Sequence, residues 1–383
     1  MVARSIVLVD PYYHGLLRTH GLSGPPAENT TYDETRVRAG DIGFGTSAAL
    51  ARALRARGWE AEIIVPNAFA LQSLWAQEHG KPPRWSRGWQ YGNHLARLPL
   101  VGGVLGSLPH IHGTLFDQVR ELRPDVLYVQ DLNLVPPALV RRLRGHVGLL
   151  VGEHASPPPP RAFFAGYDLI VSALPPLVDR LRAWGIAAEW VPLGFDARWT
   201  NTTPASQRPI DAIFVGSFSH LQPSTAPLLR AVAQQVPGLR IHGQADERVL
   251  EEYGLVDHYR GPAWGGDMFE LLGRSKLVIN RHGAIAGGFA VNMRMYEATG
   301  SGAGLVTEAR KNLADLFEPH VEVAAYDSVE RAAEIAAELI RDPPRLDALA
   351  AAGQPRTLRD HTDDRRAEQL DELFEARLTR DRK

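Results

Sequence analysis

One stretch of the chain combines a glycine-rich loop with charged residues at helical spacing. A strand-like run, Lys276 to Asn280, leads into a loop that contains Gly287 and Gly288. A helix-like segment with Arg294 and Glu297 follows. A glycine loop that opens a helix exposes backbone N–H groups to an anion such as a phosphate. A carboxylate further along that helix can accept hydrogen bonds from two sugar hydroxyls. The stretch therefore predicts a nucleotide-sugar site.

Neighbouring residues extend this expected site. Arg281 and His282 follow the strand directly, and either can supply positive charge to a diphosphate. Gly216 and Ser217 follow another apolar run, where they can approach the phosphates or the nucleotide. The expected sugar-donor residues are Gly216, Ser217, Arg281, His282, Gly287, Gly288, Phe289, Asn292, Arg294 and Glu297. The alternatives are solvated loop charges, glycines that serve only a turn, and a helix-surface ion pair that contributes about 0.2–0.5 kcal/mol.

Two histidines and one aspartate at predicted strand ends are candidates for proton transfer. His14 follows the first apolar run, His154 follows the run Val147 to Val151, and Asp131 follows a third run. A neutral imidazole near pH 7 can take a proton from a hydroxyl group. Asp131 can orient a histidine or bind an acceptor. The alternative for each histidine is a structural or solvated side chain, and strand-end aspartates often only form turns.

The composition narrows the class of protein. The chain has 383 residues, 42 basic against 44 acidic residues and a net charge of −2, so nothing in it favours binding to nucleic acid. It has no cysteine, which excludes disulfides and cysteine zinc sites, and we find no histidine spacing typical of a metal site. No apolar run is long enough for a signal peptide or a membrane span. We therefore expect a soluble cytoplasmic protein, with peripheral membrane contact left open but not indicated.

Apolar runs alternate with helical segments in two halves of the chain. This alternation predicts parallel sheets with helices on both faces, and ligands bind such sheets at the carboxyl ends of the strands. We expect an α/β protein of two Rossmann-like, doubly wound domains that face each other across a cleft. The expected division is 1–199 for the N-terminal domain, 200–209 for a linker, 210–360 for the C-terminal domain, and 361–383 for a C-terminal helix that can pack back on the N-terminal domain.

Two segments have weaker patterns. Tyr12 to Asp41 is polar and contains glycine and proline, which predicts a long functional or disordered loop. Asn67 to His110 contains Trp75, Trp85 and Trp89, and we expect short helices and loops there. Its aromatic rings can form a wall for a sugar acceptor, and packing in a core is the alternative.

The chain resembles the GT-B glycosyltransferases, and its C-terminal half resembles the CgeB-like group of the family 4-type enzymes. The resemblance extends over most of the chain from about Asp41. The four segments that carry it are Gly43 to Val65, Trp190 to Asp196, Phe214 to Ser217 and Arg294 to Ala303.

This resemblance implies an enzyme that moves a sugar from a nucleotide-diphosphate sugar to an acceptor hydroxyl, without a metal ion or another cofactor. The C-terminal domain would hold the sugar donor, with Glu297 on the ribose. The N-terminal domain would hold a small-molecule or glycan acceptor, near Gly43 and Gly45. Phe289 occupies the position of a second glutamate that many such enzymes carry. The alternatives are a nucleotide-sugar epimerase or sugar phosphorylase of the same fold, and a non-catalytic sugar-binding relative.

Overall fold

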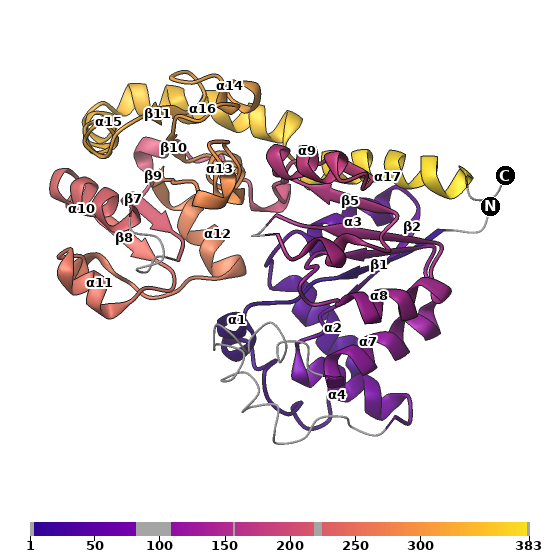
Figure 1. Cartoon of the computed structure of the whole chain (residues 1–383). Helices are drawn as coiled ribbons and strands as arrows, with labels where there is room; N and C mark the ends of the chain where they lie inside the picture. Colours follow the sequence, from indigo (N-terminus) through magenta and orange to yellow (C-terminus); the bar gives the residue numbers. More distant parts are fainter. Residues whose placement is uncertain (1–3, 82–108, 156–157, 218–223, 381–383) are drawn as a thin grey trace. The chain divides into compact units, whose positions relative to one another are not determined.

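The computed structural model describes residues 4–81, 109–155, 158–217 and 224–380, and the chain forms two units (Figure 1). The first unit comprises Met1–Val191 and Ala367–Lys383, and the second comprises Pro192–Arg366. Residues 200–209, for which we expected a linker, lie within the second unit. Arg208 explains this placement, because its buried guanidinium donates to the Thr203 carbonyl at 2.9 Å and to the Ser275 carbonyl at 3.3 Å.

The first unit contains a six-stranded parallel sheet in the order β2-β1-β3-β4-β5-β6. Its strands are β1 Arg4–Val9, β2 Trp59–Ile64, β3 Val126–Val129, β4 Leu149–Glu153, β5 Leu169–Ser172 and β6 Ala188–Trp190. Its helices are α1 His14–Thr19, α2 Tyr32–Asp41, α3 Ser47–Ala56, α4 Phe69–Glu78, α7 Pro109–Leu122, α8 Pro137–Leu143, α9 Pro175–Ala183 and most of α17 Asp363–Arg380. Apolar side chains from α3 and α17 pack on one face of the sheet, and those from α7 and α8 pack on the other.

The second unit contains a five-stranded parallel sheet in the order β11-β10-β9-β7-β8. Its strands are β7 Ile210–Val215, β8 Leu239–His242, β9 Ser275–Ile279, β10 Gly304–Glu308 and β11 Ala324–Tyr326. Its helices are α10 Thr225–Gln235, α11 Glu247–Glu252, α12 Gly265–Gly273, α13 Met293–Gly300, α14 Leu313–Leu316, α15 Val329–Arg341 and α16 Pro343–Asp360.

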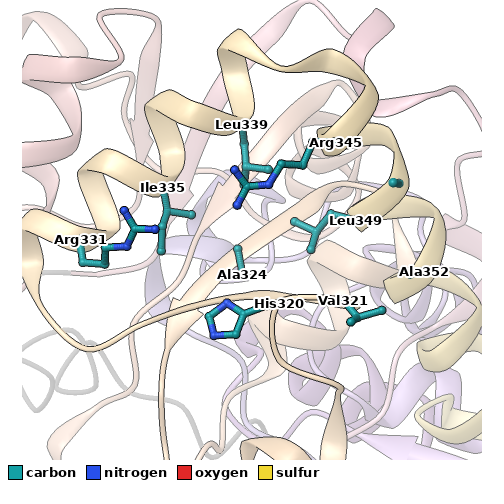
Figure 2. A pocket seen from close by; sticks show the side chains of 10 residues that line it. His320, Val321, Ala324, Arg331, Ile335, Leu339, Arg345, Leu349 and Ala352 are labelled. Carbon is teal, nitrogen blue, oxygen red and sulfur yellow. The ribbon is translucent and has the colours of Figure 1, made fainter.

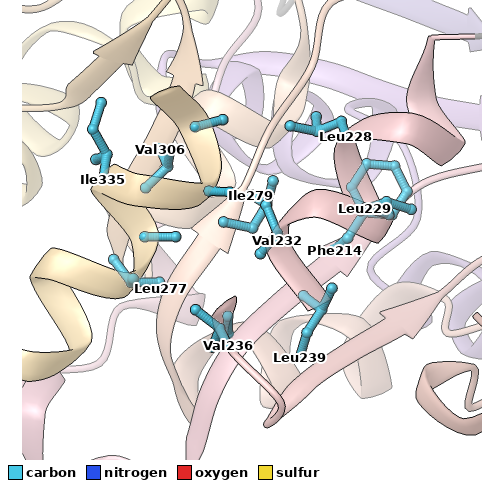
Figure 3. Packing of buried hydrophobic residues seen from close by; sticks show 14 of the residues in the cluster. Phe214, Leu228, Leu229, Val232, Val236, Leu239, Leu277, Ile279, Val306 and Ile335 are labelled. Carbon is cyan, nitrogen blue, oxygen red and sulfur yellow. The ribbon is translucent and has the colours of Figure 1, made fainter. Parts of the chain in front are cut away.

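The two faces of this second sheet explain why its strands are continuous apolar runs. Leu277 and Ile279 of β9 pack in a cluster with side chains of α10 and α15 (Figure 3). Val278, which lies between them, packs in a different cluster with side chains of α12 and α13. Successive residues of a strand point to opposite faces, so a sheet covered on both faces needs apolar residues at every position. The predicted pair of doubly wound α/β sheets is confirmed.

The structure differs from the sequence-based predictions for two segments. The predicted loop Tyr12 to Asp41 contains α1 and α2. Thr31 accepts a hydrogen bond from the Glu34 N–H at 3.3 Å, and the Glu34 carboxylate accepts one from the Thr31 N–H at 3.1 Å. This capping box begins α2, and the sequence pattern Thr-x-x-Glu is its signal. Of the expected aromatic wall, Trp75 is buried in α4, whereas Trp85 and Trp89 lie outside the described residues.

The described residues lack two further features. None of their helices is long and apolar enough to cross a membrane. They contain no group of three or more His, Cys, Asp or Glu side chains placed to hold a metal ion.

Candidate functional site

The carboxyl ends of β7 and β9 mark the point where the second sheet reverses its direction of growth. The chain runs from β7 outward to β8, and then returns to the other side of β7 to form β9 and β10. In open parallel sheets, ligands bind in the crevice at such a reversal, because the loops there leave the sheet in opposite directions. The predicted sugar-donor residues follow these two strands.

Asn280, which follows β9, organises the loop that leads to α13. Its side chain donates to Thr307 Oγ1 at 2.9 Å, and its carbonyl accepts from the Tyr326 hydroxyl at 2.8 Å. Asn292 donates to Asn280 Oδ1 at 2.8 Å and to the Arg281 carbonyl at 2.9 Å. Asn292, which we expected to bind the sugar donor, thus holds the two ends of the loop together through its side-chain NH₂.

We expected the glycine turn in this loop to present its backbone N–H groups to an anion, but two of these groups form hydrogen bonds within the turn. Gly287 and Gly288 have φ values of 58° and 90°, a region that favours glycine. The Gly287 N–H donates to the Ala284 carbonyl at 3.2 Å, and the Phe289 N–H donates to the Ala286 carbonyl at 2.9 Å. The turn therefore uses the N–H groups of Gly287 and Phe289 for its own structure, so in this conformation they do not serve an anion.

Glu297 lies on α13 in a buried ion pair. The Glu297 side chain is 7% exposed and the Arg294 side chain 15% exposed, with Oε2 of Glu297 2.6 Å from Nη1 of Arg294. Arg294 also donates from Nε to the Val215 carbonyl at 3.1 Å, which links α13 to the end of β7. Burial raises the pKa of Glu297, and the Arg294 charge opposes this rise. A surface ion pair, the alternative interpretation, does not fit this burial.

Arg294 therefore positions Glu297. The ion pair with Arg294 involves Oε2 of Glu297. A carboxylate has two oxygens, each able to accept hydrogen bonds, so a ligand hydroxyl can add to this contact.

Arginine and lysine side chains surround the same strand ends. Arg281 donates from Nη1 to Thr225 Oγ1 at 3.0 Å, at the first residue of α10. Arg310 follows β10, with its Nη2 2.9 Å from Oε1 of Glu308. Lys311 is exposed, with its ammonium 5.6 Å from the Phe289 ring centroid. Our sequence interpretation included Arg281 but missed Arg310 and Lys311. Their position directly after an apolar strand was the available signal.

His282 does not supply the positive charge that we expected. It is 1% exposed, and its Nε2 lies 3.3 Å from Thr307 Oγ1. Burial lowers the pKa of His282 to about 4, so the ring is neutral near pH 7. The backbone N–H of His282 donates to Glu308 Oε2 at 2.7 Å. His282 thus packs the loop onto β10, and the positive charge of the site comes from arginine and lysine.

Gly216 and Ser217 follow β7 at the same edge of the sheet. The Gly216 N–H donates to the His242 carbonyl at 2.9 Å, which continues the pairing of β7 with β8. Ser217 is exposed. Both residues lie one or two positions after Val215, whose carbonyl Arg294 contacts. The structure therefore brings the end of β7 to the ion pair on α13.

The three proton-transfer candidates of the first unit differ in exposure. His14 begins α1 and is exposed. His154 is 1% exposed, and its ring lies edge-on to Phe164 with a centroid distance of 6.0 Å. Asp131 accepts from the Asn133 N–H at 2.9 Å, which is a turn-forming contact. Of these three, His14 is the most exposed, Asp131 is half-buried and His154 is buried.

Gly43 and Gly45, the expected acceptor-side residues, both have left-handed backbone conformations, with φ of 74° and 67°. A Cβ atom on Gly45 would lie 3.0 Å from Oδ2 of Asp10. The loop therefore packs tightly against the carboxyl end of β1 immediately before α3.

A cavity of about 290 Å³ lies elsewhere in the second unit, between α15, α16 and the segment before β11 (Figure 2). Arg331 and Arg345 line it, and both form ion pairs with Glu338, while Arg331 also pairs with Glu334. None of the residues that follow β7, β9 or β10 lines this cavity. It is therefore separate from the candidate site.

Part of the second unit is similar to a known protein family. Residues 224–372 match the profile of a family described as glycosyl transferase-like. No curated protein sequence is significantly similar to the chain. The matched segment contains the loop after β9, the Arg294–Glu297 pair and the cations after β10.

Solved glycosyltransferase structures share the fold over nearly the whole chain. HepE from Anabaena, solved with UDP and glucose, has a TM-score of 0.62 and 15% identity, and the match covers 97% of this chain and 100% of HepE. Sucrose-phosphate synthase from Thermosynechococcus elongatus has a TM-score of 0.61 and 14% identity, with 97% and 98% covered. AviGT4, a glycosyltransferase of avilamycin A biosynthesis, has a TM-score of 0.59 and 17% identity, with 98% of each chain covered. The expected resemblance is confirmed: the chain has the GT-B fold of these glycosyltransferase structures, and residues 224–372 match the glycosyl transferase-like family.

Proposed function

We propose that the protein is a glycosyltransferase whose C-terminal unit binds a nucleotide-diphosphate sugar and whose reaction places the sugar on an acceptor hydroxyl. The observation that carries this proposal is the carboxylate of Glu297, which is buried beside Arg294 on α13, the helix that follows β9 at the reversal point of the sheet. Arg281, Arg310 and Lys311 at the adjacent strand ends supply positive charge.

Each group has a defined role in binding. The ribose hydroxyls donate to Glu297, because a charged acceptor makes stronger hydrogen bonds than a neutral one. Arg281 lies against the N-terminus of α10, where two positive electrostatic contributions combine. Glu308 lies 3.9 Å from Arg281 and 2.9 Å from Arg310, and a diphosphate would bind on the guanidinium groups that Glu308 holds at these strand ends. We place the phosphates there and not on the N–H groups of Gly287 and Phe289, which the turn already uses.

The transfer step changes two bonds and moves one proton. The bond between C1 of the sugar and the diphosphate oxygen breaks, and a bond from C1 to the acceptor oxygen forms. The acceptor hydroxyl loses its proton, and the nucleoside diphosphate leaves with an additional negative charge. Arginine and lysine side chains stabilise that charge in the transition state. We assign proton transfer to the first unit and favour His14, because His154 is buried.

Ligands of structurally similar proteins support the choice of sugar donor. HepE has been solved with UDP and with UDP-glucose. Uridine diphosphate sugars are therefore the first compounds to test, alongside the guanosine, adenosine and thymidine equivalents. The acceptor is a small molecule or a glycan with a free hydroxyl.

The direct test is turnover of a panel of nucleotide sugars by the purified chain. A transferase releases nucleoside diphosphate, slowly with water and faster when a suitable acceptor is present. Release should fall at least about tenfold in Glu297→Ala, as expected for the loss of a charged hydrogen-bond partner. An epimerase would interconvert sugars without releasing diphosphate. A phosphorylase would require inorganic phosphate, and a non-catalytic relative would bind without turnover. Any of these three outcomes would overturn the proposed reaction.

A further inference from the structure

Four polar side chains form a chain of contacts across the carboxyl edge of the first sheet. Ser47 Oγ lies 2.5 Å from Asp10 Oδ2, and it also contacts Oε1 of Gln130. Gln130 Nε2 in turn donates to Glu153 Oε2 at 3.1 Å. Asp10 follows β1, Gln130 follows β3, Glu153 ends β4, and Ser47 begins α3. The order β2-β1-β3 places this chain where the first sheet reverses its direction of growth.

The hydrogens of this chain can be counted from its contacts. Both amide hydrogens of Gln130 are used, one on Glu153 and one on Thr46 Oγ1 at 2.8 Å. Its oxygen must therefore accept the Ser47 hydroxyl hydrogen. Ser47 has only one hydrogen, so its contact with Asp10 is a hydrogen bond only when Asp10 carries a proton and donates it.

The opposite orientation of the Gln130 amide leads to the same count. In that orientation the NH₂ group donates to Ser47, and Ser47 donates to an ionised Asp10. The amide oxygen then faces Glu153 Oε2, and two acceptors at 3.1 Å repel each other unless Glu153 is protonated. Both orientations therefore require one proton on the two carboxyl groups together.

We propose that Asp10 and Glu153 share a single proton through Ser47 and Gln130, and that the orientation of the Gln130 amide decides which carboxyl group carries it. This proton-sharing site does not depend on the proposed glycosyl transfer. In the observed orientation, Asp10 carries the proton. Glu153 remains ionised and accepts from the Tyr128 hydroxyl at 2.9 Å as well as from Gln130.

The surroundings of the pair favour one retained proton. Asp10 is 8% exposed, and the described groups that shift the pKa of Asp10 or Glu153 include no Arg, Lys or His side chain. Burial raises the pKa of Asp10 to about 7, the contact with Ser47 opposes this rise, and the charges of Glu153 and Asp131 add to it. Burial also raises the pKa of Glu153. The other ionisable groups that face Asp10 are the hydroxyls of Tyr12, Tyr13 and Tyr128, whose pKa values are raised by burial and by Asp10 itself.

Loss of the shared proton has a structural consequence for the loop before α3. With both carboxyl groups ionised, the single hydrogen of Ser47 cannot serve both Asp10 and the Gln130 oxygen, so one of these contacts brings two acceptors together. Two buried negative charges also lie at the same edge of the sheet. The Gly43–Gly45 loop packs on Asp10, since a Cβ on Gly45 would approach Oδ2 to 3.0 Å. Displacement of this loop and of the ring of Phe44 relieves the repulsion. The pair thus makes the loop sensitive to pH near neutrality.

Infrared difference spectroscopy of the full folded chain tests the proposal directly, because a protonated carboxyl group has a carbonyl stretch that a carboxylate lacks. The wild-type protein should show a protonated carboxyl band at pH 6 that is lost with a midpoint near pH 7. Asp10→Asn should lack this band, because the asparagine NH₂ donates to Ser47 without a titrating proton. Glu153→Gln should move the midpoint down by at least about one pH unit, since its amide satisfies Gln130 and leaves Asp10 ionised.

Asp125→Asn is the matched control. Asp125 precedes β3, at the opposite end of that strand, and accepts from the Ser5 N–H at 2.8 Å. This variant should retain the wild-type band and midpoint. A wild-type spectrum without the band at pH 6 would overturn the proposal. A midpoint in Glu153→Gln equal to that of the wild type would also overturn it, because Asp10 would then hold its proton independently of Glu153. Two single variants provide the test, so failure of one of them to fold leaves the other decisive.

Discussion

Replacement of Glu297 separates its binding role from its structural role. In Glu297→Ala the ribose loses its charged acceptor, and Arg294 remains buried without its partner. In Glu297→Gln the side chain keeps its size and one oxygen acceptor for Arg294 but loses its charge. The alanine variant should bind the nucleotide more weakly and be less stable, whereas the glutamine variant should mainly bind more weakly.

The magnitudes follow from the geometry of the pair. A hydrogen bond to a charged group contributes about 1.5–3 kcal/mol, which corresponds to a factor of roughly 10–150 in Kd. The two side chains are 7% and 15% exposed, so removal of one partner leaves an uncompensated buried charge. Breaking a buried pair in this way typically costs about 3–5 kcal/mol of stability. We expect the alanine variant to show both effects.

Isothermal titration calorimetry with the nucleotide that binds the wild-type protein measures the first effect, and chemical denaturation measures the second. Glu334→Gln provides a control, because Glu334 forms an exposed ion pair with Arg331 at 3.0 Å in the same unit. That variant should have wild-type affinity and nearly wild-type stability. If both Glu297 variants bind within twofold of the wild type, Glu297 does not contact the ribose and the argument from its burial is wrong.

Three other changes have distinct expected results. Arg310→Ala and Lys311→Ala should each weaken binding of a nucleoside diphosphate by about three- to tenfold, because these side chains would contact phosphate. The affinity for the nucleoside should be unchanged, and calorimetry with both ligands measures the two affinities. His14→Ala should lower turnover at least about 100-fold in a protein of normal stability. His154→Ala should lower the melting temperature, because His154 is buried. Normal turnover in a folded His14→Ala variant would show that His14 does not take part in the reaction. Burial raises the pKa of Asp10 from 3.8 to about 7, so its contribution to stability is fully present below about pH 4 and is lost as the pH rises to about 7. Asp10→Asn should reduce this pH dependence of the melting temperature between pH 4 and 8. Parallel plots of melting temperature against pH for the two proteins would contradict the prediction.

Patterns of apolar residues were sufficient to predict the fold. Strands buried on both faces must be apolar at every position, so runs such as Ile6 to Val9 were visible without a structure. Helix α2 was missed, because its residues are mostly polar and its start depends on the capping box of Thr31.

The candidate site was predicted less completely, because its details depend on hydrogen bonds between distant residues. His282 was expected to be charged, but contact with Thr307 requires the pairing of β9 with β10 and buries the ring. Asn292 contacts Asn280 across the loop, and nothing local in the sequence specifies that contact. The role of Glu297 on the ribose stays a prediction, and its burial with Arg294 follows only from the packing of α13.

A crystal structure of the chain with a bound nucleoside diphosphate tests the central claim most directly. The account predicts that the ribose hydroxyls lie within hydrogen-bond distance of Glu297, and that the diphosphate lies beside Arg281 and Arg310 at the carboxyl ends of β9 and β10. A nucleotide bound in the first unit, or in the second unit away from α13, would contradict the account.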